Sequence, residues 1–196
     1  MDNSSTKERI MDAAIKLFSD RGYDVVSMRD IAAMVGIKAA SIYNHFPSKQ
    51  DIKKTIYDYY IEQFSLLSPK KEELLRKLET EPLRDALGAL SFYYPPELQD
   101  RMDRILLIAS QRICLDKDSE IFVHKHFFEP LKKNWVIVLN RGIELGKIRP
   151  VDIDSFIKLA TYHAFSAAEL NRTAMKITYK QWLKVLDLLF SLLEPV

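Results

Sequence analysis

The chain has 196 residues, of which 47% are hydrophobic, and a formal net charge of +2. This length and composition are typical of a soluble globular protein with one large core, or with a small core and a larger one. No segment reaches the ~18 uninterrupted apolar residues that a membrane span needs. The net charge is well short of the strongly basic balance of many isolated DNA-binding domains.

Helical periodicity extends over the whole chain. Apolar residues recur at the ~3.6-residue spacing of a helix, and no alternating run is long enough for a strand, so we expect an all-α fold. The first helix begins after Ser5, which has capping-box spacing to Glu8, and ends at Gly22. We expect this helix to support the two shorter helices that follow.

The stretch from Ser27 to Lys49 predicts two short helices bent around Gly36. Ser27 has capping-box spacing to Asp30, and glycine adopts the left-handed backbone angles of a sharp turn without steric cost. The second helix, expected over residues 39–45, has an apolar inner face and a short polar outer face. This arrangement is typical of a helix-turn-helix, whose second helix enters the DNA major groove, although an ordinary helical corner is the alternative.

The wider pattern favours DNA binding. It comprises IMDAAIKLF from Ile10, then Gly22 and Tyr23, and afterwards SMRDIA, Gly36, SIYNHF and the pair Ser48 and Lys49. Over about the first 60 residues, it closely resembles the N-terminal domain of the tetracycline-repressor (TetR) family. The resemblance implies a three-helix, helix-turn-helix DNA-binding domain (1–48), a connecting helix (49–68) and a C-terminal helical bundle for effector binding and dimerisation (69–196).

The resemblance also implies roles for single residues. Tyr43 and Lys49 match the family's Tyr and Lys that position the domain on phosphates. Where the family commonly has a Ser cap, this chain has Lys38, Ala39 and Ala40, so base readout is expected to depend on Lys38 and on methyl contacts. The full predicted DNA-binding set is Ser27, Arg29, Lys38, Ala39, Ala40, Ser41, Tyr43, Asn44, His45 and Lys49.

The connecting helix is expected from Lys49 to Leu67, with a cap at Ser48 and a stop at Pro69. Lys53 and Lys54 are expected to form a basic cluster with Lys38 and Lys49 near the start of the connecting helix. Nearby acids, Asp12, Asp20 and Asp24 among them, nearly balance this charge, so we expect a modest number of phosphate contacts.

Beyond Pro69, the pattern predicts a bundle of six further helices. Glu129 and Pro130 fall inside the fourth, which we therefore expect to be kinked or broken there. The expected ranges are Lys70–Glu79, Pro82–Tyr93, Glu97–Leu115, Ser119–Leu145, Ile153–Arg172 and Tyr179–Leu193.

The last two of these helices predict a homodimer. The first carries several alanines that permit close helix approach, and the second is apolar around much of its circumference. Such a helix must be buried on several sides, and a partner subunit provides one of them, as the resemblance also implies. Packing within one chain alone is the alternative.

The middle of the bundle predicts a small-molecule pocket, because aromatic residues there are interrupted by a few polar groups. A plain core would have the same composition, and the resemblance transfers no pocket residue. The candidate set is Phe92, Tyr93, Gln111, Arg112, Phe128, Trp135, Tyr162, His163 and Ser166.

Motifs of catalysis are missing. His124 and His126 are two residues apart and would point to different faces of a helix, which makes a shared metal unfavourable. No phosphate-binding glycine loop or catalytic triad signature is present, so we predict no enzyme activity, no cofactor and no metal. We interpret the single Cys114 as a small core residue, and the polar N-terminus and the lack of a possible disulfide predict a cytoplasmic protein.

Together these features predict a dimeric transcriptional regulator, and specifically a repressor that binds a palindromic operator and is released by a small molecule. A helical enzyme or adaptor that retains the corner as scaffold is the alternative. We expect the effector to act by tilting the connecting helix, which would change the separation of the two DNA-reading domains.

Overall fold

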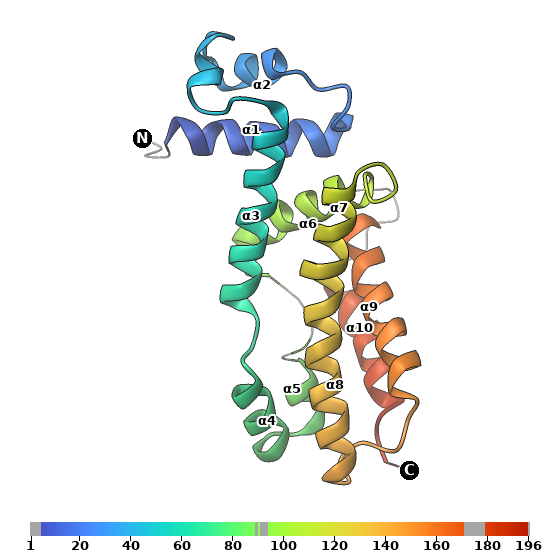
Figure 1. Cartoon of the computed structure of the whole chain (residues 1–196). Coiled ribbons are helices and arrows are strands. Elements are labelled where there is room, and N and C mark those ends of the chain that lie inside the picture. The colour runs from blue at the N-terminus through green and yellow to red at the C-terminus, as the bar shows by residue number, and fades with distance from the viewer. Residues whose placement is uncertain (1–4, 89, 91–93, 171–178, 196) are drawn as a thin grey trace. The chain divides into compact units, whose positions relative to one another are not determined.

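The computed structural model describes residues 5–88, 90, 94–170 and 179–195 (Figure 1). These residues form helices and connecting turns, with no strand among them, which confirms the predicted all-α class. They divide into two compact units. The first comprises residues 1–66 and 95–122, and the second comprises residues 67–94 and 123–196.

The first unit begins with α1 (Thr6–Arg21) and α2 (Met28–Val35), and both capping boxes are present as predicted. Gly22 ends α1 with a φ of +89°, and Gly36 ends α2 in the left-handed region with a φ of +78°. Both glycines therefore hold backbone angles that other residues rarely adopt.

The predicted second reading helix is shorter than expected. Only η1 (Ser41–Asn44) is helical, and it is a 3₁₀ turn, in which His45 N–H bonds the carbonyl of Ile42. The residue before it, Ala40, provides no side-chain cap. Without a cap at its start and with Pro47 close behind its end, this segment does not extend into a regular α-helix.

The helix α3 (Lys49–Leu67) has the predicted bounds, and Ser48 caps it by accepting the Asp51 N–H at 3.2 Å. The same unit includes α6 (Pro96–Ser110) and α7 (Lys117–Ile121), and α6 packs along α1. The sequence predicted that this helix extends to residue 115, but α6 ends at Ser110 and is followed by 3₁₀-type turns. Cys114 lies in these turns and is exposed, so the prediction that it is a core residue was wrong.

The second unit contains α4 (Lys71–Thr80), α5 (Leu83–Gly88), α8 (Glu129–Glu144), α9 (Ile153–Leu170) and α10 (Tyr179–Ser191). In Figure 1, α8, α9 and α10 run side by side. Their apolar faces share one core with α4 and α5, in which Trp135 packs against Phe156 and Phe190. Of the predicted range Pro82–Tyr93, residues 89 and 91–93 lie outside the described residues.

The long helix expected around Glu129 and Pro130 changes its helix type there and stays helical, so the predicted break is not seen. A π-helical segment, η2 (Phe122–Phe128), precedes α8, and Pro130 stands in the first turn of α8. Because proline has no N–H to donate, it is tolerated in a first turn but not in the interior of a continuous α-helix.

Gly142 and Lys147 fix the turn that follows α8. A Cβ on Gly142 would lie 2.4 Å from the Cδ1 of Ile148, so only glycine permits this close approach. The Nζ of Lys147 donates to the carbonyls of Leu78, Glu79 and Glu81 at 2.6, 3.1 and 3.4 Å, and these carbonyls lie at the C-terminal end of α4. A lysine at a helix C-terminus satisfies carbonyls that have no partner within the helix.

Candidate nucleic-acid interface

The polar side of η1 is open to solvent, while its apolar side is anchored in the core. Ile42 and Phe46 are 0% and 2% exposed, whereas Tyr43 is 53% exposed. Asn44 and His45 are exposed as well, and Ser41 is half-buried. The buried pair therefore fixes the direction in which the polar side chains project.

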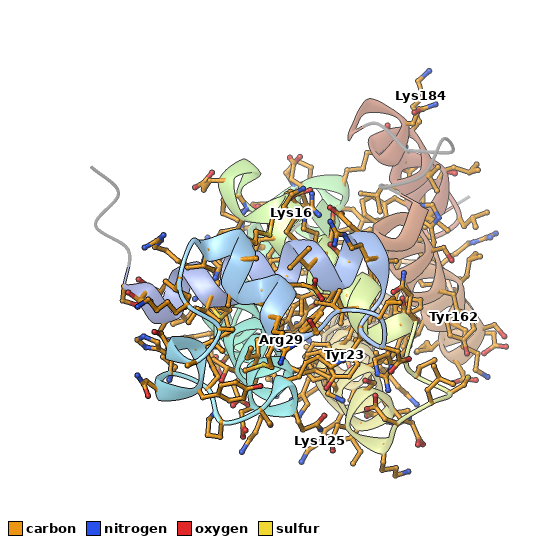
Figure 2. The ribbon with its side chains drawn as sticks, turned by 90° about the horizontal axis from the view of Figure 1, so that it is seen from above. Lys16, Tyr23, Arg29, Lys125, Tyr162 and Lys184 are labelled. Carbon is orange, nitrogen blue, oxygen red and sulfur yellow. The ribbon has the colours of Figure 1, made fainter. Side chains whose placement is uncertain are left out.

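The turn before η1 and the start of α2 complete the exposed set. Lys38, Ala39 and Ala40 are all exposed, as are Ser27 and Arg29, and Figure 2 labels Arg29 together with Tyr23. The Ser27 hydroxyl donates to Asp30 Oδ2 at 2.5 Å and accepts the Asp30 N–H at 3.2 Å. The capping box thus engages the hydroxyl of Ser27. The hydrogen bonds that this hydroxyl and the Ser27 N–H donate to the Asp30 carboxylate lower the pKa of Asp30.

Lys49 differs from the rest of the predicted set, because its ammonium group is directed at the protein's own backbone. Its Nζ donates to the carbonyls of Tyr23, Asp24 and Val26 at 2.7, 3.4 and 2.8 Å. It also lies 4.3 Å from the centroid of the Tyr23 ring. Burial is the main cause that lowers the pKa of Lys49.

Tyr23 is the centre of a basic cluster that sequence analysis did not identify. Besides Lys49, the Nζ of Lys53 and the guanidinium of Arg112 lie 5.3 and 4.5 Å from its ring centroid. Its hydroxyl donates to Gln50 at 3.2 Å. Cations are attracted to the negative face of an aromatic ring, so Tyr23 can join the turn after α1 to α3 and to the segment after α6.

The expectation that Lys53 belongs to a basic cluster on the surface was wrong. Its side chain is 2% exposed, and its Nζ lies 2.9 Å from Asp116 Oδ1. Asp116 also accepts hydrogen bonds from Arg112 and from the Ser119 N–H. Burial raises the pKa of Asp116, but these hydrogen bonds outweigh it and hold the pKa well below its usual range.

A sequence signal for the burial of Lys53 does exist. Lys53 precedes Ile56 by three residues and Tyr60 by seven, so it lies on the same face of α3 as these two buried residues. Its partner Asp116 is 63 residues away in the chain, which no local pattern can predict.

Three acidic residues that were predicted to lie near the basic cluster form ion pairs with arginines of the first unit. Arg104 pairs with Asp20 at 2.9 Å, and Arg112 pairs with Asp24 at 2.8 Å. Arg101 pairs in the same way with Asp12 at 3.0 Å. These carboxylates therefore repel a DNA backbone less than their number in the sequence suggests.

The predicted pocket residues are not gathered in one place. Gln111 and Arg112 belong to the first unit, and the guanidinium of Arg112 is held by Asp24 and Asp116. Phe92 and Tyr93 lie outside the described residues.

The remaining pocket candidates belong to the second unit. Trp135 is buried in the core, whereas Phe128 makes an edge contact with Tyr162, at 5.9 Å between ring centroids. Tyr162 is 59% exposed and projects from α9 in Figure 2, and Ser166 is exposed. His163 is half-buried, and burial lowers its pKa.

Within the part of the chain that the structure describes, no group of three or more His, Cys, Asp or Glu side chains is placed to hold a metal ion. Among the same residues, no helix has both the length and the hydropathy needed to cross a bilayer.

Comparisons with known proteins point to one family. The sequence model of the bacterial regulatory proteins, tetR family, matches residues 10–56. Over 57 residues, the chain is 49% identical to IcaR, the biofilm operon icaADBC HTH-type negative transcriptional regulator of Staphylococcus aureus strain Newman. This match spans 27% of the chain and 31% of IcaR, so it covers about a third of that relative's length.

Two longer matches cover most of the chain. It is 26% identical over 153 residues to the HTH-type transcriptional repressor KstR2 of Mycolicibacterium smegmatis, which spans 77% of the chain and 72% of KstR2. The crystal structure of PfmR, a TetR family transcriptional regulator from Thermus thermophilus, has a TM-score of 0.68 at 21% identity and covers 98% of this chain and 100% of PfmR. At this identity, the likeness to PfmR concerns the fold alone.

The segment matched by the family model includes every residue of the predicted DNA-binding set, from Ser27 to Lys49. The fold of the whole chain agrees with that of a solved TetR family regulator. Residues 10–56 are therefore similar to the TetR family of bacterial regulatory proteins, and the fold is like that of a solved member of that family.

Proposed function

We propose that this protein is a cytoplasmic transcriptional repressor that binds a palindromic operator as a homodimer and releases it when a small molecule binds. The observation that carries the proposal is the surface around η1. Its side chains Tyr43, Asn44 and His45 are exposed next to two anchoring residues that are buried. Short polar side chains on a rigid corner are suited to base edges and phosphates in the major groove.

The charges around η1 support the same proposal. Lys38 and Arg29 are exposed and can meet phosphates, while the acids Asp20 and Asp24 are paired with arginines of the first unit. Because this surface offers only a small number of cations to phosphates, we expect a modest dependence of affinity on salt.

The proposed homodimer uses α9 and α10. Leu159 and Tyr162 on α9 are 50% and 59% exposed, and Leu188 and Leu192 at the end of the chain are 65% and 40% exposed. Large apolar side chains that recur on two neighbouring helices are typical of a protein interface. Two subunits would then present two identical reading surfaces to one palindrome.

We assign effector binding to the helical region after residue 68, with residues 1–48 as the DNA-reading part and residues 49–68 as the connection. The relatives IcaR and KstR2 carry the names of a negative regulator and a repressor, which supports repression here. A ligand that prefers a different separation of the two reading surfaces would weaken DNA binding, and DNA would weaken the ligand equally.

Selection of bound duplexes from a random DNA pool tests this function. The expected result is a palindrome whose half-sites are centred about 10 base pairs apart, or a multiple of a helical turn. Recovery of single asymmetric sites would contradict the dimer. Absence of any preference over the starting pool would contradict sequence-specific DNA binding and favour an adaptor or enzyme.

A variant at α10 tests the interface separately. Leu188→Asp is expected to give monomers in sedimentation velocity and to lose affinity for the selected palindrome, because a buried unpaired carboxylate disfavours the dimer. Leu66→Asp is the matched control, since Leu66 on α3 is 71% exposed, as open as Leu188 at 65%. Equal behaviour of the two variants would contradict the interface.

A further inference from the structure

The ammonium group of Lys49 is fully engaged within the chain. It has three N–H groups, and three carbonyl oxygens, those of Tyr23, Asp24 and Val26, accept hydrogen bonds from it. A phosphate ligand would need at least one of these hydrogens directed outward. The geometry leaves none that is not already aimed at a backbone carbonyl.

These three carbonyls belong to the turn that positions α2. Gly22 opens the turn with a positive φ, the 2%-exposed Val26 anchors it in the core, and Ser27 follows as the N-cap of α2. Lys49, as the first residue of α3, therefore connects the start of α3 to the start of α2. Any shift of the turn would move α2 and, through Gly36, the exposed residues of η1.

The second unit contains the same arrangement at a place where no DNA contact is proposed. Lys147 donates to three consecutive or near-consecutive carbonyls at the end of α4, at 2.6 to 3.4 Å. Both lysines thus bring a cation to carbonyl oxygens of a chain turn, which is a structural use of the side chain.

We propose that Lys49 is a positioning residue, which holds the turn over residues 23–26 and through it the DNA-reading surface, and is not itself a phosphate ligand. The proposal rests on the proposed function, because a reading surface needs positioning only if DNA is read. It replaces the phosphate role that the family resemblance implies for this residue.

Substitution by arginine distinguishes the two roles. Arginine keeps the positive charge and binds phosphate well, but its planar guanidinium cannot direct three hydrogens at the three converging carbonyls as a compact ammonium does. If Lys49 positions the turn, Lys49→Arg is therefore expected to lose DNA affinity. If Lys49 binds phosphate, the same variant would keep its affinity. Lys49→Met keeps the apolar stem and removes the charge, and Lys54→Met removes an equal charge from an exposed position on the same helix.

The first measurement needs no DNA. In ¹⁵N relaxation of the free protein, order parameters of residues 23–26 are expected to fall below about 0.6 in Lys49→Arg and Lys49→Met, and to stay near about 0.85 in the wild type and in Lys54→Met. Unchanged order in both Lys49 variants would overturn the proposal. If Lys49→Met does not fold, its spectrum will show this, and the comparison is then made between Lys49→Arg and the wild type.

The second measurement uses the duplex recovered from the random pool and an unrelated duplex of equal length, each titrated at several salt concentrations. Both Lys49 variants are expected to bind the selected duplex about tenfold more weakly, with the salt slope unchanged. A slope reduced by about 1 in Lys49→Met, with equal losses on both duplexes and full rescue by Lys49→Arg, would show a phosphate ligand and overturn the proposal. If the wild type itself shows no preference between the duplexes, the proposed function fails, and the positioning role fails with it.

Discussion

Replacement of Asp116 by Asn is expected to destabilise the first unit by about 3 kcal/mol. The carboxylate lies 2.9 Å from the Nζ of Lys53, a side chain that is 2% exposed. At this separation, two opposite unit charges attract by about 6 kcal/mol for an effective dielectric constant of about 20, and desolvation offsets about half of that. The amide oxygen of Asn can still accept the Ser119 N–H, so the cap of α7 is retained while the charge is lost.

The double variant provides the internal control. Lys53→Met leaves Asp116 paired with Arg112, so the expected loss is smaller, about 1–2 kcal/mol. Lys53→Met combined with Asp116→Asn leaves neither charge buried, and its cost is expected to be close to that of Lys53→Met alone. The two sites are therefore expected to be coupled by about 3 kcal/mol, because the loss from Asp116→Asn disappears once Lys53 has been replaced.

Urea unfolding of the four proteins measures this coupling. Both tryptophans of the chain, Trp135 and Trp182, belong to the second unit, so their fluorescence follows that unit, while far-ultraviolet circular dichroism follows both units. The loss is expected in the circular dichroism transition of the first unit. Losses that add within about 0.5 kcal/mol would refute a charge pair between these two residues.

Three further predictions concern the turn after α8, acid stability and the effector response. Gly142→Ala is expected to lower the free energy of unfolding by about 1–3 kcal/mol, because its Cβ would lie 2.4 Å from the Cδ1 of Ile148. Gly88→Ala is the control, since a Cβ at Gly88 would meet nothing within 4 Å, and thermal unfolding should show no loss of stability in this variant. Because the folded chain lowers the pKa of Asp116, the stability that this carboxylate contributes is present above about pH 4 and is lost as the pH falls. The difference in unfolding free energy between wild type and Asp116→Asn should therefore shrink from about pH 4 to pH 2. A constant difference in urea titrations over this range would contradict the prediction. Spin labels at residue 44 of both subunits are expected to report an ångström-scale change in separation when an identified effector releases DNA, and release without any change would refute the tilting of α3.

Local signals predicted much of the first unit. The bounds of α3 followed from the cap at Ser48 and the stop near Pro69, because a capping side chain and a proline act on neighbouring backbone groups alone. The same holds for the starts of α1 and α2. The 3₁₀ character of η1 was not predicted, because the apolar spacing of Ile42 and Phe46 fits an α-helix equally well.

The interior contacts of the candidate site could not be predicted. The partners of Lys49 lie 23 to 26 residues away, and the partner of Lys53 lies 63 residues away, so no local pattern identifies either set of contacts. Arg112 was likewise predicted to line a pocket, and the structure instead directs it to Asp24 and Asp116. Charge pairing between distant segments depends on how the segments pack, and a single sequence contains no signal for that.

The most direct test of the DNA-reading surface around η1 is a shift assay with fragments of the source genome, run with the wild type and with Asn44→Ala. Asn44 is exposed on η1, so its truncation removes polar contacts and leaves the core intact. The wild type is expected to retard a few fragments at concentrations well below those at which it retards the rest, and Asn44→Ala is expected to lose that preference while keeping its nonspecific binding. Uniform retardation of all fragments by the wild type, or an Asn44→Ala variant with unchanged preference, would contradict the account.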